Sequence, residues 1–303
     1  MDQPFPTTIE RDGETLRGPW RHPRQMLGDQ AYDGHASVHD DSVAADLGLV
    51  GAPIEGPTHF SQFDPIGFEL FGDRWFAEGC ISAHFENMVV EGEDVQASAR
   101  LVRPGVAEAE AVKRHGDRVL TASMTVGNSP TLLDERLAAA QAREPGDLFI
   151  IDRLERGMTS GPHDATMTMD ERNGDLYPFS LAQKLSAITE PSPWFRDGSP
   201  WGPPIVPTEM LSVMAHRAGA SMPVRGPSIG LFIDLEVRRL APVLVDDPLS
   251  VTHEVVALGQ SRRVESYWTR STIRTDSGDA VATVLLHQGI FKASYEGYPS
   301  TDS

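Results

Sequence analysis

Hydrophobic and polar residues follow the same order twice along the chain: a Pro-rich loop, a helical stretch and a series of β-prone runs. The second copy is the clearer one. Its residues 208–219 place three apolar side chains at helical spacing, with Thr208 as the predicted N-cap and Gly219 as the predicted stop. The first copy has the same Pro-Thr opening in residues 58–72, where Pro65 predicts a shortened or kinked helix.

Each helical stretch is followed by matching β-prone runs. Residues 84–102 and 235–258 both predict a strand, an acidic turn and a second, alternating strand. Residues 117–127 and 279–293 each follow a predicted turn and have the composition of strands. Each copy therefore predicts one helix packed against a run of antiparallel strands, which is an α+β arrangement.

The repeat divides the chain into three segments. We predict an N-terminal unit in residues 1–131, a linking helix in residues 132–147 and a C-terminal unit in residues 148–303. Leucines and alanines favour the linking helix, and Pro145 and Gly146 are expected to end it. A chain of 303 residues is long enough for two units of this size with a sizeable core.

The composition limits which binding partners and which cellular compartment we expect for this protein. No apolar run approaches the roughly 20 residues that cross a bilayer, and the N-terminal stretch is acidic where a secretory signal would be basic. Cys80 is the single cysteine and cannot form an internal disulfide. The net charge of −18 argues against nucleic acid or an anionic membrane as a partner. We therefore expect a cytoplasmic protein that binds a small molecule.

The densest group of polar residues lies in residues 32–41, just before a predicted short helix in residues 42–48. Asp33 and His39 belong to this group, and Asp41 or Ser42 could cap the helix. Acidic and imidazole side chains beside helix-terminal amides are the parts that acid–base chemistry on a carbonyl compound needs. The alternative is that the acidic residues here are ordinary loop and capping residues.

Residues 39–60 resemble the hydratase motif of the MaoC-like dehydratases, the (R)-specific enoyl-CoA hydratases. His39 falls on the catalytic histidine of that motif, Asp41 on the acidic residue two positions later, and Gly56 on the glycine whose amide helps to bind the thioester carbonyl. The resemblance implies a double hot-dog fold, with two antiparallel sheets that each wrap a central helix. It also implies an acyl thioester substrate, with CoA as part of the substrate and no other cofactor, and reversible addition of water across a 2,3-double bond.

The chain departs from that motif at two positions that matter for catalysis. The motif has its catalytic aspartate five residues before the histidine, where this chain has Gly34, and Asp33 lies one residue earlier. The histidine before the loop glycine is replaced by Glu55. An extra loop residue would let Asp33 serve, but His35 or Asp40 could also have replaced the aspartate.

The resemblance implies a role for each residue of the site. Asp33 and His39 would share the proton transfers on one water molecule, and the Gly56 amide would stabilise the enolate-like oxygen. We also expect His35 and Asp40 to contact the substrate. Thr58 is expected to cap the central helix or to touch the ligand.

The second copy has no histidine in the corresponding loop. Residues 194–210 instead contain two tryptophans and four prolines, which suit a rigid apolar wall. We therefore expect one active site per chain, with the second copy shaping the substrate tunnel and Trp201 lining it. Plain core packing is the alternative for these aromatic residues.

The polar loop of the first copy, residues 32–41, also contains residue types that bind metal ions. His35, His39 and Asp40 are ligand types at close spacing, but the loop sequence does not give the regular geometry of a helix, so we expect no metal.

Three functions remain open at this stage. They are a hydratase or dehydratase of acyl thioesters, a hot-dog thioesterase or lyase with a specialised substrate, and a non-catalytic binding protein. A monomer and a homodimer are both compatible with the sequence.

Overall fold

The described part of the chain is organised around one antiparallel sheet of eleven strands. The computed structural model describes residues 4–30, 37–46, 48–217 and 222–299. The strands of the first half are β1 (Glu10–Asp12), β2 (Thr15–Arg17), β3 (Gly79–Phe85), β4 (Val95–Arg103), β5 (Val106–Lys113) and β6 (Arg118–Val126). Those of the second half are β7 (Thr159–Asp164), β8 (Gly230–Arg239), β9 (Leu249–Gln260), β10 (Val264–Thr275) and β11 (Ala280–Phe291).

The strand order repeats on the two sides of a central seam. The full order is β1-β2-β4-β5-β6-β3-β8-β11-β10-β9-β7. Counting outward from the seam, β3-β6-β5-β4 in the first half corresponds to β8-β11-β10-β9 in the second. The pairs from Cys80 with Arg238 to His84 with Asp234 join the halves edge to edge. The two expected sheets are therefore one continuous sheet, because β3 and β8 pair instead of leaving exposed edges.

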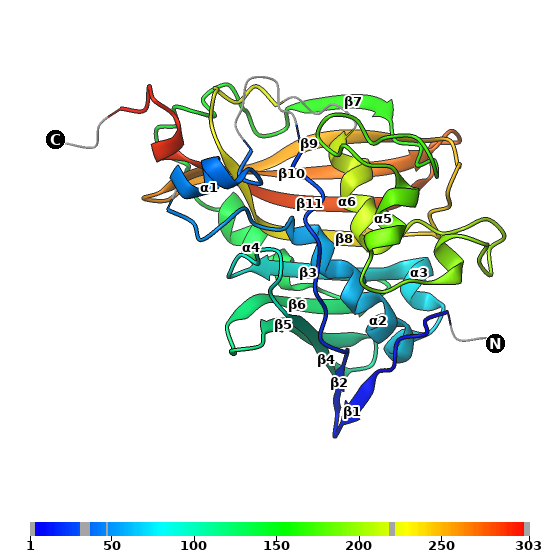
Figure 1. The fold of residues 1–303 in the computed structure, drawn as a ribbon. Coiled ribbons are helices and arrows are strands. Elements are labelled where there is room, and N and C mark those ends of the chain that lie inside the picture. Colours follow the sequence, from blue (N-terminus) through cyan, green and yellow to red (C-terminus); the bar gives the residue numbers. More distant parts are fainter. Residues whose placement is uncertain (1–3, 31–36, 47, 218–221, 300–303) are drawn as a thin grey trace.

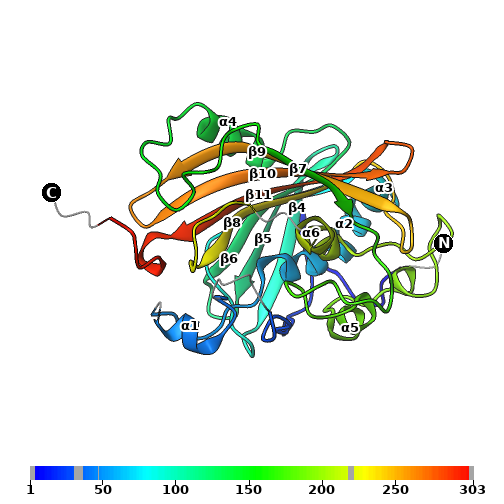
Figure 2. The same ribbon diagram turned by 90° about the horizontal axis from the view of Figure 1, so that it is seen from above.

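The central helices lie together on one face of this sheet (Figures 1 and 2). In the first half, the central segment consists of η1 (Gly56–Phe63) and α2 (Asp64–Phe71), and α3 (Arg74–Glu78) follows it. In the second half it is α6 (Thr208–Arg217), which packs against η1. Both segments are covered by the concave sheet, so this is the expected double hot-dog architecture.

Local sequence explains how the first central helix differs from the second. Pro65 lies in the first turn of α2, where a missing amide costs nothing, and the chain before it forms a 3₁₀ helix. The predicted shortening at Pro65 is therefore confirmed. The predicted N-cap role of Thr208 is wrong, because Thr208 is itself the first residue of α6 and its hydroxyl donates to the buried Asp64. Gly219, the predicted stop, lies outside the described residues.

The remaining helices surround this core. The segment between the halves contains α4, which begins after a capping box made by Thr131 and Asp134 and ends before Pro145. It contacts β3, β8 and β9 on the face of the sheet opposite the central helices (Figure 2). The bounds are α1 (Asp41–Asp46), α4 (Leu132–Gln141), α5 (Leu181–Ala187), η2 (Pro193–Phe195) and η3 (Lys292–Ser294). None of the helices in the described ranges is long and apolar enough to cross a membrane.

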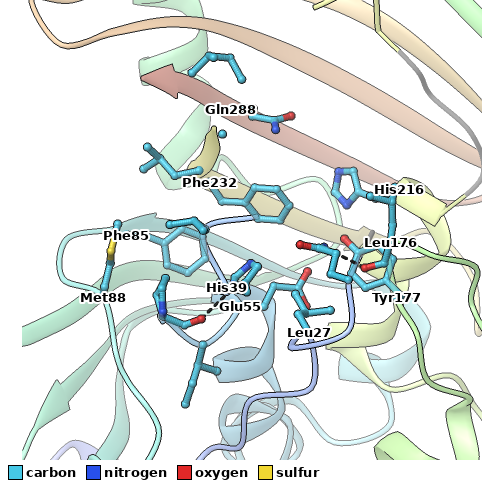
Figure 3. A pocket seen from close by; sticks show the side chains of 18 of the residues that line it. Leu27, His39, Glu55, Phe85, Met88, Leu176, Tyr177, His216, Phe232 and Gln288 are labelled. Atoms are coloured by element: carbon cyan, nitrogen blue, oxygen red, sulfur yellow. Dashed lines mark hydrogen bonds between the residues drawn. The ribbon is translucent and has the colours of Figure 1, made fainter. Parts of the chain in front are cut away.

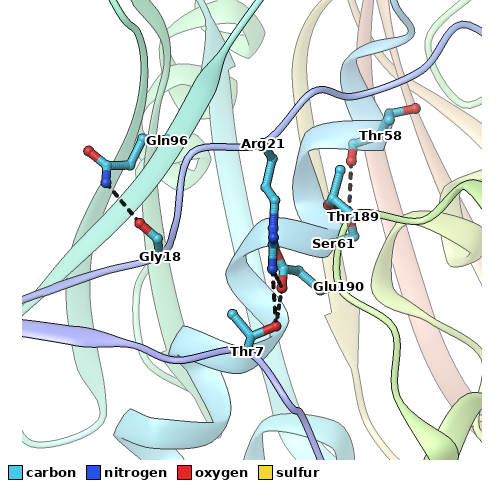
Figure 4. A network of polar contacts seen from close by, with 8 residues as sticks. All are labelled: Thr7, Gly18, Arg21, Thr58, Ser61, Gln96, Thr189 and Glu190. Atoms are coloured by element: carbon cyan, nitrogen blue, oxygen red, sulfur yellow. Dashed lines mark hydrogen bonds and ion pairs between the residues drawn. The ribbon is translucent and has the colours of Figure 1, made fainter.

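Polar contacts tie the N-terminal segment and the first central helix to the second half (Figure 4). The Arg21 guanidinium donates to both carboxylate oxygens of the buried Glu190, at 2.6 and 2.9 Å. Thr7 donates to the same carboxylate. On η1, the Ser61 hydroxyl lies 2.8 Å from the Thr189 hydroxyl. A bidentate pair of this kind holds the two halves in one relative position.

A buried carboxylate strengthens the seam between the halves. Asp234 on β8 is fully buried, and its two oxygens accept hydrogen bonds from His84 at 2.8 Å and His287 at 2.7 Å. Arg136 of α4 adds an ion pair at 2.9 Å. Burial alone would raise the pKa of Asp234, but these hydrogen bonds and the nearby charges lower it to about 2.

We expect Asp234→Asn to lower the free energy of unfolding by about 2 kcal/mol at pH 7. The pKa of this carboxyl is lower in the folded than in the unfolded chain, so its stabilisation is fully present above about pH 4. It is lost as the pH falls toward the folded value of about 2. Urea unfolding of both proteins at pH 7 and pH 3.5 measures this, and a difference that grows toward low pH would contradict it.

Candidate active site

A cavity of about 490 Å³ lies between the two halves, on the helix side of the sheet (Figure 3). Both halves line it. The first half contributes the loop before η1 and the end of β3, and the second contributes the end of α6, strands β8 and β11 and the loop before α5. The apolar part of its wall includes Leu27, Val38, Phe85, Met88, Val119, Leu176, Leu231, Phe232 and Ile290. Polar groups such as His39, Glu55 and Gln288 interrupt the apolar wall, and a cavity of this size with both kinds of lining suits a small molecule.

His39 is half-buried in the wall of this cavity, and the loop before η1 fixes its orientation. Its Nδ1–H donates to the Pro53 carbonyl oxygen at 2.6 Å, because a carbonyl can only accept. The neutral ring therefore carries its lone pair on Nε2, and no hydrogen bond to Nε2 occurs within the described part of the chain. Burial lowers the pKa of His39, partly offset by the bond to Pro53. The imidazole is thus neutral at pH 7 and ready to accept a proton.

Gly56 lines the cavity at the first residue of η1. A Cβ at this position would lie 2.6 Å from the ring of Phe85, which is closer than real contacts allow. Glycine thus lets the aromatic wall pack directly against the backbone at the start of the helix. In this first turn Pro57 has no N–H, and the Thr58 amide donates to the Glu55 carbonyl at 3.1 Å. The donor at this end of η1 that suits a developing negative charge is therefore the Gly56 amide.

Glu55 lies between Pro53, whose carbonyl oxygen binds His39, and Gly56, the first residue of η1. Its side chain enters the cavity wall and hydrogen-bonds to Tyr177, which lines the same cavity (Figure 3). Only 7% of Glu55 is exposed. Burial raises its pKa to about 7, although the nearby Lys184 charge and the Tyr177 hydrogen bond act in the opposite direction.

Behind the cavity wall, a buried ion pair reaches Glu55 from the second half. Lys184 of α5 lies 2.9 Å from Glu209 of α6 and donates to the Thr58 hydroxyl at 3.1 Å. Burial also raises the pKa of Glu209 to about 7, against the attraction of Lys184. Two buried carboxylates thus share one buried ammonium, and keeping both ionised would leave an uncompensated charge in the interior.

The structure places three of the predicted substrate contacts away from the cavity. The Asp40 carboxylate accepts from the amides of Ser42 and Val43 and caps α1, so the capping residue is Asp40 and not Asp41 or Ser42. The Thr58 hydroxyl binds Lys184 and caps nothing, since η1 has no side-chain cap. Trp201 packs edge-on against the Trp194 ring at 6.0 Å, and both partly buried rings pack against the apolar core.

None of these three residues lines this cavity, and their expected contact with a ligand stays a prediction. The second half shapes the cavity through other elements than the tryptophan-rich loop. Asp33 and His35 lie outside the described residues, so their expected roles stay predictions. No group of metal-ligating side chains occurs among the residues that the structure describes.

Sequence reasoning missed several residues that line the cavity. Glu55 was recognised only as a departure from the hydratase motif. His59 and His216, on the two central helices, both line the cavity, and burial lowers the pKa of each to about 4, so both are neutral. Tyr177 comes from a loop without a motif. Only its position in the fold could have revealed it, because the loop is distant in sequence from the residues it meets.

Comparison with known proteins supports the fold. No protein-family model matches the chain, and no curated protein matches its sequence significantly. A solved structure from Chloroflexus aurantiacus, described as a putative MaoC domain protein dehydratase, is similar with a TM-score of 0.55 and 15% identity, over 94% of this chain and 97% of that one. A conserved protein of Mycobacterium tuberculosis with a double hot-dog fold is similar with a TM-score of 0.53 and 15% identity, over 83% of this chain and 86% of that one. The chain therefore has the double hot-dog fold found in these proteins.

Proposed function

We propose that this protein is a hydro-lyase that adds water to, or removes it from, the 2,3-position of an acyl thioester of the CoA type. The observation that carries the proposal is the tethered His39, a neutral imidazole in the cavity wall beside the start of η1, whose Nε2 has no hydrogen-bond partner among the described residues. The fold shared with a protein described as a putative MaoC domain dehydratase supports the same reaction class.

In this proposal, dehydration begins with proton abstraction from C2 by Nε2 of His39. The negative charge that develops on the thioester oxygen is stabilised by the amide end of η1 at Gly56. The hydroxyl then leaves from C3 with a proton from a second acid, and hydration is the reverse. Asp33 is the candidate for the second acid that the motif suggests.

The cavity supports an apolar acyl group. Aromatic and aliphatic side chains form much of its wall, with Phe85 and Phe232 flanking the space above His39 (Figure 3). Apolar side chains next to the reacting atoms lower the local dielectric constant and so strengthen electrostatic interactions with those atoms. We infer that the enzyme acts on a hydrophobic thioester in the cytoplasm.

The experiment that tests the proposal is an assay of crotonyl-CoA, octenoyl-CoA and cinnamoyl-CoA. We expect the enone absorbance to fall with at least one of them, without release of free thiol. Thiol release would point to a thioesterase. If no thioester reacts or binds, the hydro-lyase proposal is wrong, and a non-catalytic binding protein becomes the better account.

A further inference from the structure

We infer that Glu55 is the second acid–base group of the active site and works opposite His39 on the leaving or attacking water. This inference rests on the proposed hydro-lyase function. It assigns catalysis to a residue at which the chain departs from the hydratase motif.

The geometry of one short loop carries the inference. Residues 53–56 hold His39 through the Pro53 carbonyl, place Glu55 in the cavity wall and begin η1 with Gly56. One proton-transfer group and the helix amide thus come from this four-residue loop, which also holds His39, and all of them line one cavity. Figure 3 shows the side chains of His39 and Glu55 both directed into this space.

The surroundings of Glu55 keep a proton available at neutral pH. The side chains that act on its pKa are Lys184 of α5, Glu209 of α6 and Tyr177 of the cavity wall. The other charged or titratable residues that line the same cavity are His39, His59, Glu86, Asp175, His216, Arg217 and Tyr267. The Glu209 charge raises the pKa of Glu55, and the Lys184 charge lowers it. With burial as the largest cause, the pKa of Glu55 is about 7, which suits a group that must both give and take a proton.

Every proton and electron pair that moves in the proposed dehydration has a donor and an acceptor. In dehydration, Nε2 of His39 takes the C2 proton, and the electrons of that C–H bond form the C2=C3 double bond. The C3–O bond breaks, and the Glu55 carboxyl proton joins the leaving hydroxyl to give water. Hydration reverses each transfer, so in both directions the active form carries one proton on the pair.

Because one proton must be shared, we expect a bell-shaped pH profile of kcat/KM whose descending limb lies near pH 7. Below that limb Glu55 is protonated; above it both groups are deprotonated and activity falls. The ascending limb lies below the usual histidine value, since burial lowers the pKa of His39.

The test compares Glu55→Gln with Glu55→Asp, Glu209→Gln and Asp33→Asn, using whichever of crotonyl-, octenoyl- or cinnamoyl-CoA the native protein hydrates. Glu55→Gln keeps the size and the hydrogen-bonding ability of the side chain but cannot transfer a proton. We expect its kcat to fall about 10²- to 10³-fold with a smaller change in KM, and the limb near pH 7 to disappear. Glu55→Asp should retain the limb with reduced kcat. The matched control is Glu135→Gln, a carboxylate on the exposed side of α4.

Glu209→Gln tests whether Glu55 titrates during turnover or only supports the structure. It removes the charge that raises the pKa of Glu55, so the descending limb should move to lower pH while turnover persists. Thermal unfolding of each variant shows whether it folds.

The outcomes distinguish failure of the Glu55 inference from failure of the hydro-lyase proposal. If folded Glu55→Gln keeps kcat within about threefold and retains the limb near pH 7 while Asp33→Asn loses activity, Asp33 is the second group and the Glu55 inference is overturned, with the hydro-lyase proposal intact. If the native protein hydrates no thioester, the hydro-lyase proposal fails and the Glu55 inference falls with it.

Discussion

His39→Asn is expected to lower kcat for thioester hydration by about 10³- to 10⁴-fold, with little change in KM. The Nδ1–H of His39 is fixed by the Pro53 carbonyl, and an asparagine amide can donate to the same oxygen. The substitution therefore removes the proton-transfer nitrogen while it keeps the hydrogen bond that positions the side chain. Steady-state rates with the best enoyl-CoA substrate measure the effect.

The matched control for His39 is Asp46→Asn, an exposed substitution on α1. It should leave kcat unchanged. A folded His39→Asn protein that keeps more than about a tenth of the native kcat would show that the imidazole does not transfer a proton in the rate-limiting step.

The largest expected effect on stability comes from Asp64, at the point where the two central helices meet. This fully buried carboxylate accepts from Trp75 Nε1 at 2.8 Å and from the Thr208 hydroxyl. Arg239 donates to the same hydroxyl at 2.9 Å and to the Val206 carbonyl at 3.0 Å. Burial raises the pKa of Asp64 and lowers that of Arg239 to about 10, and each charge partly offsets the effect on the other.

We expect Asp64→Ala to lower the free energy of unfolding by about 3–5 kcal/mol. The change leaves the buried Arg239 charge without its compensating carboxylate and the Trp75 indole N–H without an acceptor. Urea unfolding at pH 7 measures the loss.

A double-mutant cycle with Arg239→Met gives the control for Asp64. Removing both charges should cost less than the sum of the two single substitutions, because an apolar replacement of a buried pair avoids the unpaired charge. A loss below about 1 kcal/mol for Asp64→Ala, or full additivity, would mean that the two charges do not support each other.

The fold was largely predictable because its signals are local. Pro65 fixes where α2 begins, and the paired acidic turns and alternating strands reveal the repeat. The continuous sheet was not predictable in the same way. Pairing of β3 with β8 joins residues about 150 positions apart, and each strand has the pattern of any half-buried strand.

The site was predictable only where a motif carried it. His39 and Gly56 were identified from residues 39–60, and both line the cavity. Trp201 was placed by analogy between the two copies, but it is partly buried and packs on Trp194 against the core. An aromatic residue in a Pro-rich loop serves packing as readily as a tunnel wall.

Glu55 could not have been recognised from the sequence as a titrating group. A glutamate in a loop is normally solvated, and its pKa depends here on burial and on Lys184 and Glu209, which the fold brings from more than 120 positions away. Long-range electrostatics of this kind have no signature in the local pattern.

The most direct test of the hydro-lyase proposal is mass spectrometry of the product formed from an enoyl-CoA in water enriched in heavy oxygen. The proposed mechanism predicts an intact thioester with one heavy oxygen on C3 as a hydroxyl group, formed by the native protein and lost in His39→Asn. Free CoA together with heavy oxygen in a released carboxylate would instead show thioester hydrolysis and would contradict the hydro-lyase proposal.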